Sequence, residues 1–160
     1  MDRKIVENIR GQLKDVQNGI TWYDDNIEKK IKPITEKQAF IRPIPEIHSI
    51  AELISHIWVW RMHTLKKLKG LDSNLTIESP ENWKGNEELK TIGWTQLKED
   101  LKQSQHELVQ FLADKDDAYL ESHALGEKYT PKQMAEGIIH HDLYHLGQIG
   151  ITIKLLNDRL

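Results

Sequence analysis

The chain has 160 residues and no cysteine; 38% of the residues are hydrophobic, 29% are charged, and the formal net charge is −3 at pH 7. This composition is typical of a soluble globular protein of one-domain size, and it excludes a disordered or fibrous chain. The slight acidic excess argues against a nucleic-acid-binding surface, and the lack of cysteine excludes disulfides, thiolate metal ligands and a cysteine nucleophile.

The first part of the chain is predicted to be helical, because its apolar residues recur every three to four positions and no segment alternates as a β-strand does. The first helix is expected over residues 2–18. An irregular stretch follows, and then a short helix at residues 27–31 and a turn of helix at residues 35–40. Prolines before and after the latter keep the region from forming one continuous helix.

A second long helix has a clear start signal. Ser49 and Glu52 match the capping-box pattern S-x-x-E directly ahead of an apolar run. The pattern predicts a helix that continues to Gly70, a residue type that commonly follows a helix C-terminus. A connection of about twenty residues, 71–90, comes next, which is long for a compact domain.

The second half of the chain predicts two more long helices. The third is expected over residues 91–113 and is followed by a polar, irregular segment at 114–129. The fourth begins at the N-cap residue Thr130, has Pro131 in its first turn, and continues to about Leu156.

Four long helices predict an all-α fold, a four-helix bundle that forms a single domain over residues 1–160. The long crossover between the second and third helices lets these two run parallel, and an up-down-up-down bundle with short loops is the alternative. The N-terminus has no signal-peptide-like apolar core, and no apolar run reaches membrane-spanning length. We therefore expect a cytoplasmic protein that contacts neither membrane nor nucleic acid.

The segment HHDLYHLGQIG, residues 140–150, suggests a metal site on the fourth helix. At about 100° per residue, His141 and His145 lie on one side of a largely apolar helix, whereas His140 points away from them. Imidazoles four positions apart on a helix can place two ring nitrogens on one ion. The alternative is that these are packed core histidines with ordinary hydrogen bonds.

A third ligand is expected from the second helix, because two ligands hold a metal poorly. His56 borders the apolar stripe of that helix and is the first choice. His63 is the reserve, since it lies two turns further along, about 10 Å away by helix rise. The remaining candidates, His48, His106 and His123, lie before or outside the inferred core faces.

Other polar and aromatic residues near these positions have open roles. Glu52 either orients His56 or only caps its helix. Gln148 shares the face of His145, and a structural hydrogen bond is the favoured interpretation. Asp142 is predicted to point off the ligand face, toward solvent or a basic partner. Trp83 and Trp22 lie in irregular segments and are the best aromatic candidates for a pocket or lid.

Two segments together, IPEIHSIAELISHIWVW and EGIIHHDLYHLGQIG, resemble the DinB-like family of DNA-damage-inducible proteins, which also takes in bacillithiol S-transferases. The similarity extends over most of the chain. It follows the order of an early Trp-containing loop, a capped helix with the pattern P-x-P-x-x-H-S-I, and a last helix with H-x-x-x-H-x-G-Q.

The resemblance implies a bundle in up-down-down-up order and a divalent metal ion, commonly nickel or zinc, held by three histidines. These correspond to His56, His141 and His145, the trio that helix geometry also selects. Iron or manganese would accept the same nitrogen ligands. Family members are often homodimers. Many relatives have Arg where this chain has Leu146, which puts in doubt any role that an arginine plays there.

Three imidazoles leave coordination positions open, which is typical of a catalytic metal site. Because the chain has no cysteine, any thiolate must come from a low-molecular-weight thiol as cosubstrate. The first hypothesis is therefore metal-dependent thiol S-transfer to a small electrophile, and metal-assisted hydrolysis is the enzymatic alternative. The non-catalytic alternatives are a stress-related metal- or ligand-binding bundle and a structural bundle with hydrogen-bonded histidines.

Overall fold

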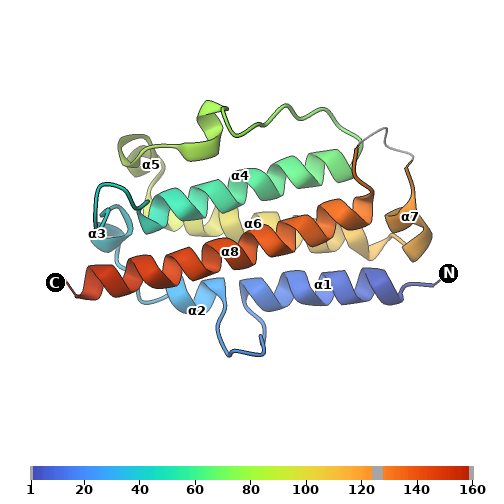
Figure 1. The fold of residues 1–160 in the computed structure, drawn as a ribbon, viewed down its shortest axis with the longest axis horizontal. Coiled ribbons are helices and arrows are strands. Elements are labelled where there is room, and N and C mark those ends of the chain that lie inside the picture. The colour runs from blue at the N-terminus through green and yellow to red at the C-terminus, as the bar shows by residue number, and fades with distance from the viewer. Residues whose placement is uncertain (1, 124–127, 159–160) are drawn as a thin grey trace.

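The fold comes from a computed structural model that describes residues 2–123 and 128–158. Within these residues the chain is all helical and has no β-strand. None of their helices combines the length and the apolar character needed to cross a membrane. The bundle consists of four long helices, namely α1 (Lys4–Gln17), α4 (Ile50–Leu68), α6 (Trp94–Ala113) and α8 (Pro131–Asn157) (Figure 1).

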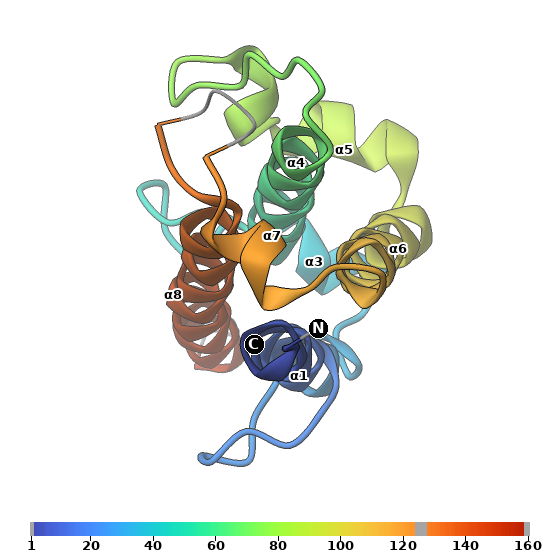
Figure 2. The same cartoon turned by 90° about the vertical axis from the view of Figure 1, so that its right-hand side faces the viewer.

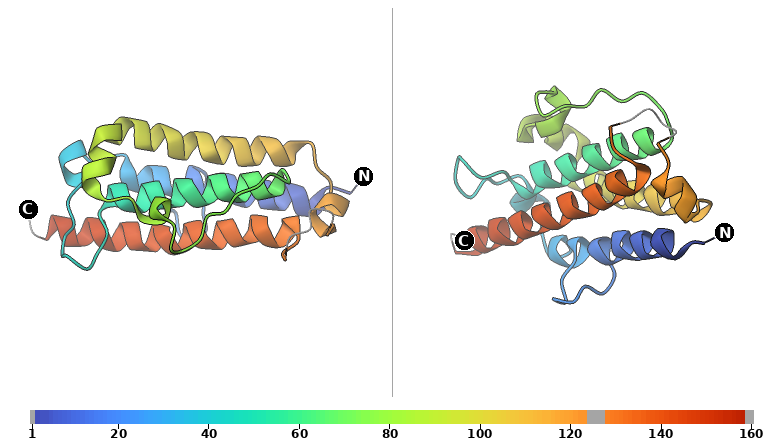
Figure 3. Two further views of the ribbon diagram at one scale, coloured as in Figure 1. Left: turned by 90° about the horizontal axis from the view of Figure 1, so that it is seen from above. Right: turned by 45° about the vertical axis from the view of Figure 1, so that its right-hand side comes forward.

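The long helices are arranged in up-down-down-up order. In Figure 1, α1 and α8 run in one direction and α4 and α6 run in the other. In the view along the bundle, α4 and α1 occupy opposite corners, and α6 and α8 lie between them (Figure 2). The parallel neighbours α4 and α6 are joined by a connection that returns along the outside of α4 (Figure 3). The predicted fold is confirmed, and the short-loop alternative is excluded.

The predicted start signals are present as complete caps. At α4, the Ser49 hydroxyl accepts a hydrogen bond from the Glu52 backbone N–H at 3.1 Å, and the Glu52 carboxylate accepts from the Ser49 N–H at 2.8 Å. Thr130 and Gln133 form the same box at α8, where Pro131 occupies the first turn. Caps of this kind satisfy N–H groups that the helix leaves without partners, and each is worth about 1 kcal/mol.

The connection between α4 and α6 contains more structure than the sequence predicts. It includes a 3₁₀ turn, η1 (Pro80–Trp83), and a short helix, α5 (Asn86–Ile92). The third long helix begins at Trp94 and not at residue 91, because Gly93 has φ +88° and ψ 148°. A residue with a side chain rarely adopts that conformation, so the glycine separates α5 from α6.

The shorter helices lie in the connections between the long helices along the chain. The predicted short helices are α2 (Ile27–Ile31) and α3 (Glu36–Ala39). The segment predicted as irregular, 114–129, contains α7 (Asp117–Glu121), whose N-terminus is capped by the side chain of Asp116. Residues 124–127 of that segment lie outside the described residues.

The core between the four helices is mainly aliphatic, with residues such as Leu13, Leu53 and Leu101 exposed by no more than 2%. Each fully buried side chain of this size contributes about 1.5–3 kcal/mol relative to exposure. The core also contains the side chain of Arg61, which is 1% exposed and lies at its centre among all four long helices. A buried guanidinium costs stability unless it is paired, so the hydrogen-bond and ion-pair partners of Arg61 are what allow it to lie in the core.

Candidate metal centre

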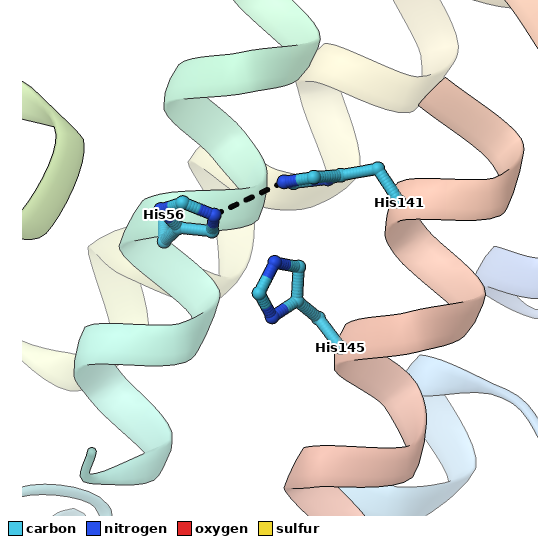
Figure 4. A group of neighbouring side chains, drawn as sticks. All are labelled: His56, His141 and His145. Atoms are coloured by element: carbon cyan, nitrogen blue, oxygen red, sulfur yellow. Dashed lines mark hydrogen bonds between the residues drawn. The ribbon is translucent and has the colours of Figure 1, made fainter. Parts of the chain in front are cut away.

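Three imidazoles converge between α4 and α8 (Figure 4). His56 comes from α4, and His141 and His145 come from successive turns of α8. His56 is 6% exposed, His145 is 4% exposed, and His141 is half-buried. One ring nitrogen of each lies within 4.8 Å of the other two, so the group could hold a metal ion. The structure thus brings together the trio that the sequence selected.

Hydrogen bonds fix the protonated nitrogen of two of the rings. His56 Nδ1 lies 2.8 Å from the backbone carbonyl oxygen of Asn82. His145 Nδ1 lies 2.6 Å from the amide oxygen Oε1 of Gln148. Because both oxygens only accept, each Nδ1 carries the hydrogen, and each Nε2 of the neutral ring keeps its lone pair. Gln148 therefore acts on the site itself, beyond the structural role that the sequence favours for it.

Burial keeps these two rings neutral. It lowers the pKa of His56 to about 4, and the neighbouring His145 and His141 add to the effect. It also lowers the pKa of His145 to about 4, again with a smaller contribution from His141. A neutral imidazole is the form that binds a metal ion. At pH 7 both rings are therefore ready to accept a cation without first losing a proton.

The contact between His56 and His141 supports the fit of a cation. Their Nε2 atoms are 3.0 Å apart. Since His56 carries its hydrogen on Nδ1, a direct hydrogen bond would need His141 to donate from Nε2. That tautomer leaves the buried His141 Nδ1 as a bare acceptor 3.6 Å from the Asp142 carboxylate, which is unfavourable.

In the opposite tautomer His141 carries its hydrogen on Nδ1, and two Nε2 lone pairs face each other across 3.0 Å. A bound cation turns this repulsion into attraction. Two nitrogen ligands that each lie about 2.1 Å from one ion are separated by roughly 3.0–3.4 Å. The donor set and this spacing therefore fit a divalent metal ion.

An aromatic stack covers the histidine group. The Trp83 ring, from η1, lies between the rings of His48 and His56, with centroid distances of 3.8 and 3.9 Å and interplanar angles of 1° and 8°. The Trp60 indole N–H donates to the Asn82 side chain at 2.8 Å and so ties η1 to α4. Trp83 thus stacks directly on a ring of the histidine group, whereas Trp22, the other aromatic candidate, is fully exposed in the loop between α1 and α2.

The other candidates lie outside the group. Glu52 caps α4 and pairs with Arg42 at 2.7 Å, so its carboxylate is used in the cap and in this ion pair. Although burial opposes ionisation, the hydrogen bonds from Arg42 and Ser49 lower the pKa of Glu52. His63 Nδ1 lies 2.8 Å from the Ser73 hydroxyl. The remaining histidines are not among the described residues that could share an ion, namely His48, His106, His123 and His140.

A cavity of about 550 Å³ opens on the exposed side of His141. Its walls come from the second half of α4, the start of α8 and the residues just before α8. The apolar lining consists of Trp60, Tyr129, Met134 and Ile138, and Lys67 and Lys128 contribute ammonium groups. None of the described residues that line it is acidic. A cavity of this size suits a small organic molecule.

Behind the histidines lies an ion pair of which only one partner is predicted from the sequence. Asp142 was predicted to face solvent or a basic partner, and it is 1% exposed and paired with Arg61 at 2.9 Å. Arg61 is not among the predicted residues, although a charged residue inside the apolar run IWVWRM indicates a buried charge that needs a partner. The pair spans α4 and α8 directly beneath the histidine group.

The fold and the histidine group define an all-α bundle with a candidate three-histidine metal site. The family model of the DinB superfamily matches residues 21–149, which include all of α4 and the part of α8 that carries both histidines. The chain therefore belongs to the DinB superfamily. Comparison with curated proteins and with solved structures found no match.

Proposed function

We propose that the chain binds a divalent metal ion through His56, His141 and His145 and acts as a metal-dependent thiol S-transferase on small electrophiles. The observation that carries this proposal is the convergence of three buried or half-buried imidazole nitrogens beside a cavity for a small molecule. Two of these rings have their Nε2 lone pairs fixed by hydrogen bonds at Nδ1. Nickel or zinc is the expected ion, and iron or manganese would accept the same ligands.

A divalent ion with open positions would lower the pKa of a bound thiol and so supply the nucleophile. The chain contributes no sulfur nucleophile of its own, because it has no cysteine. In the transfer, the sulfur of the external thiol forms a bond to an electrophilic carbon. In a substitution, the leaving group departs with its electron pair and the thiol proton is released to solvent. Where the thiol adds across a double bond, the thiol proton ends on the product.

The cavity beside His141 is the proposed site for these reactants. Trp60 and Ile138 would pack against their apolar parts, and the ammonium groups of Lys67 and Lys128 would favour a carboxylate or another anionic group. An anionic thiol fits this lining better than a cationic one, since no described lining residue is acidic.

Hydrolysis is the weaker enzymatic alternative, because a nearby base would help a metal-bound water to lose its proton. The carboxylates of Asp142 and Glu52, the nearest to the histidines in sequence, are held by Arg61 and Arg42 respectively. A bundle that binds a metal or ligand without turnover is the remaining alternative, and turnover assays separate the three.

The proposal includes the homodimer that the family resemblance implies and the cytoplasmic location that the N-terminal sequence leads us to expect. Exposed apolar residues gather on the loop after α1, with Ile20 and Trp22, and on the outer side of α8, with Leu143 and Ile151. Exposed apolar groups of this kind favour association with another protein surface. Analytical ultracentrifugation tests this part directly, and a monomer at micromolar concentration would refute it.

The function is tested first by metal content and then by turnover. Elemental analysis of the purified protein should find close to one divalent ion per chain, and the variants His141→Ala and His56→Ala should lose it. His140→Ala, an exposed neighbour on the same helix, is the matched control and should keep the ion. The loaded protein should then consume thiol together with members of an electrophile panel. No metal in the wild-type protein would refute the site, and metal without thiol consumption would leave the binding function.

A further inference from the structure

The Arg61–Asp142 pair lies at the junction of all four long helices. Arg61 Nε donates to Asp142 Oδ2 at 2.9 Å, which joins α4 to α8. Its Nη1 donates to the Gln17 side chain at 2.8 Å and to the Leu101 carbonyl oxygen at 3.1 Å, which adds α1 and α6. Both charged side chains are 1% exposed. A pair so deeply buried gains little from its charges alone, so its presence suggests a further use.

Only one oxygen of the Asp142 carboxylate, Oδ2, accepts a hydrogen bond within this pair. Its Oδ1 is buried and has no hydrogen-bond partner, and the same is true of His141 Nδ1. These two atoms are 3.6 Å apart. A buried donor and a buried acceptor rarely both lack a partner, and here each is the other's neighbour.

The positions of the two residues on α8 explain how they meet. Consecutive helical residues point about 100° apart, so His141 reaches the histidine group while Asp142 reaches the core of the bundle. The carboxylate therefore lies on the Nδ1 side of the ring, away from the Nε2 atom that faces His56. Asp142 is also not one of the described residues that could share the ion, so it is no fourth ligand.

We infer that Asp142 is a positioning residue for the metal ligand His141, and that Arg61 holds its carboxylate in place for that role. This inference rests on the proposed metal site. An N–H···O contact of ordinary length needs the 3.6 Å separation to close by roughly half an ångström, which a small rotation of the ring achieves. The hydrogen then lies on Nδ1, and Nε2 is free for the ion.

The three rings would then be held in the same way. His56 donates from Nδ1 to a backbone carbonyl, His145 donates to an amide oxygen, and His141 donates to a carboxylate. Only the last acceptor carries a charge. A carboxylate behind an imidazole raises the basicity of the ligating nitrogen, and partners of this kind commonly change metal affinity 10- to 100-fold.

The test is a comparison of metal affinity in metal-free wild-type protein, Asp142→Asn and the control Gln17→Met, titrated with Co²⁺ against a chromophoric chelator. Asp142→Asn should bind Co²⁺ roughly 10- to 100-fold more weakly and should shift the ligand-field absorption of the bound ion. Gln17→Met removes a different partner of Arg61 and leaves His141 alone, so its affinity should stay within about twofold of wild type.

The outcomes separate this inference from the proposed function. Failure of the wild-type protein to bind Co²⁺ would overturn both. Wild-type binding with unchanged affinity and spectrum in Asp142→Asn, or an equal loss in Gln17→Met, would overturn only the positioning role. If Asp142→Asn does not fold, the double variant Arg61→Met/Asp142→Leu leaves no unpaired charge in the core. It should show the same weakened binding, and wild-type affinity there would also refute the inference.

Discussion

Replacing Arg61 by methionine should destabilise the metal-free protein strongly. Met fills most of the same volume, but it leaves the carboxylate of Asp142, 1% exposed, without a counter-charge. Removing one partner of a buried ion pair costs about 3–5 kcal/mol. Natural domains are stable by about 5–15 kcal/mol in total, so the loss is a large share. At about 2–4 °C per kcal/mol for a chain of this size, the melting temperature should fall by roughly 6–20 °C.

The double variant Arg61→Met/Asp142→Leu should recover most of this loss, because it removes both charges together. Urea unfolding followed by helical circular dichroism gives the free energies, and the m-values check that each variant unfolds in one step. Lys90→Met is the control, since the Lys90–Glu87 pair is exposed and should contribute no more than about 1 kcal/mol. A loss below about 1 kcal/mol in Arg61→Met would refute the reasoning. So would a double variant whose loss in free energy of unfolding equals the summed losses of Arg61→Met and Asp142→Leu.

Three further predictions concern pH, substrate charge and the backbone. The pKa of His56 and of His145 is about 4 in the fold and about 6.5 in an unfolded chain, so the unfolded state binds more protons between these values. The stability of the metal-free protein should therefore fall as the pH drops from 6.5 to 4, by on the order of 3 kcal/mol in total, in urea titrations; a flat profile over this range would contradict the assigned burial. Lys67→Met and Lys128→Met should each raise the KM for 3-mercaptopropionate roughly two- to fivefold and leave that for 2-mercaptoethanol unchanged, and equal effects on both thiols would rule out charge recognition. Gly93→Ala should cost about 1–3 kcal/mol in the same unfolding assay, because φ +88° is strained for alanine, and a neutral result would mean that the turn between α5 and α6 relaxes.

The helices and the histidine trio were predictable because their signals are local. The capping boxes at Ser49 and Thr130 need only residues three positions apart, and the spacing of His141 and His145 follows from the helical repeat. The choice of His56 needed only the expectation that α4 and α8 pack together. For the caps and the pair on α8, the deciding information therefore lies within a few residues of the sequence.

The parts of the site that escaped prediction depend on contacts between distant residues. The carbonyl of Asn82 meets His56 across 26 positions, and Arg61 meets Asp142 across 81. No periodic pattern of residues in the sequence predicts either contact. The 3₁₀ turn Pro80–Trp83 is also too short to show a helical repeat, so the sequence marks Trp83 as a pocket candidate but does not predict that its ring stacks on His48 and His56.

The histidine group makes the metal-free bundle less stable than an apolar core of the same volume would be. Two imidazoles are desolvated, a third has a buried nitrogen without a partner, and two Nε2 atoms meet at 3.0 Å. A bound ion would relieve each of these unfavourable features, and at a thousand times its dissociation constant it would add about 4 kcal/mol to the stability. Because Arg61 joins Asp142, the neighbour of the proposed ligand His141, to α1 and α6, that gain would stabilise the whole bundle and not α4 and α8 alone.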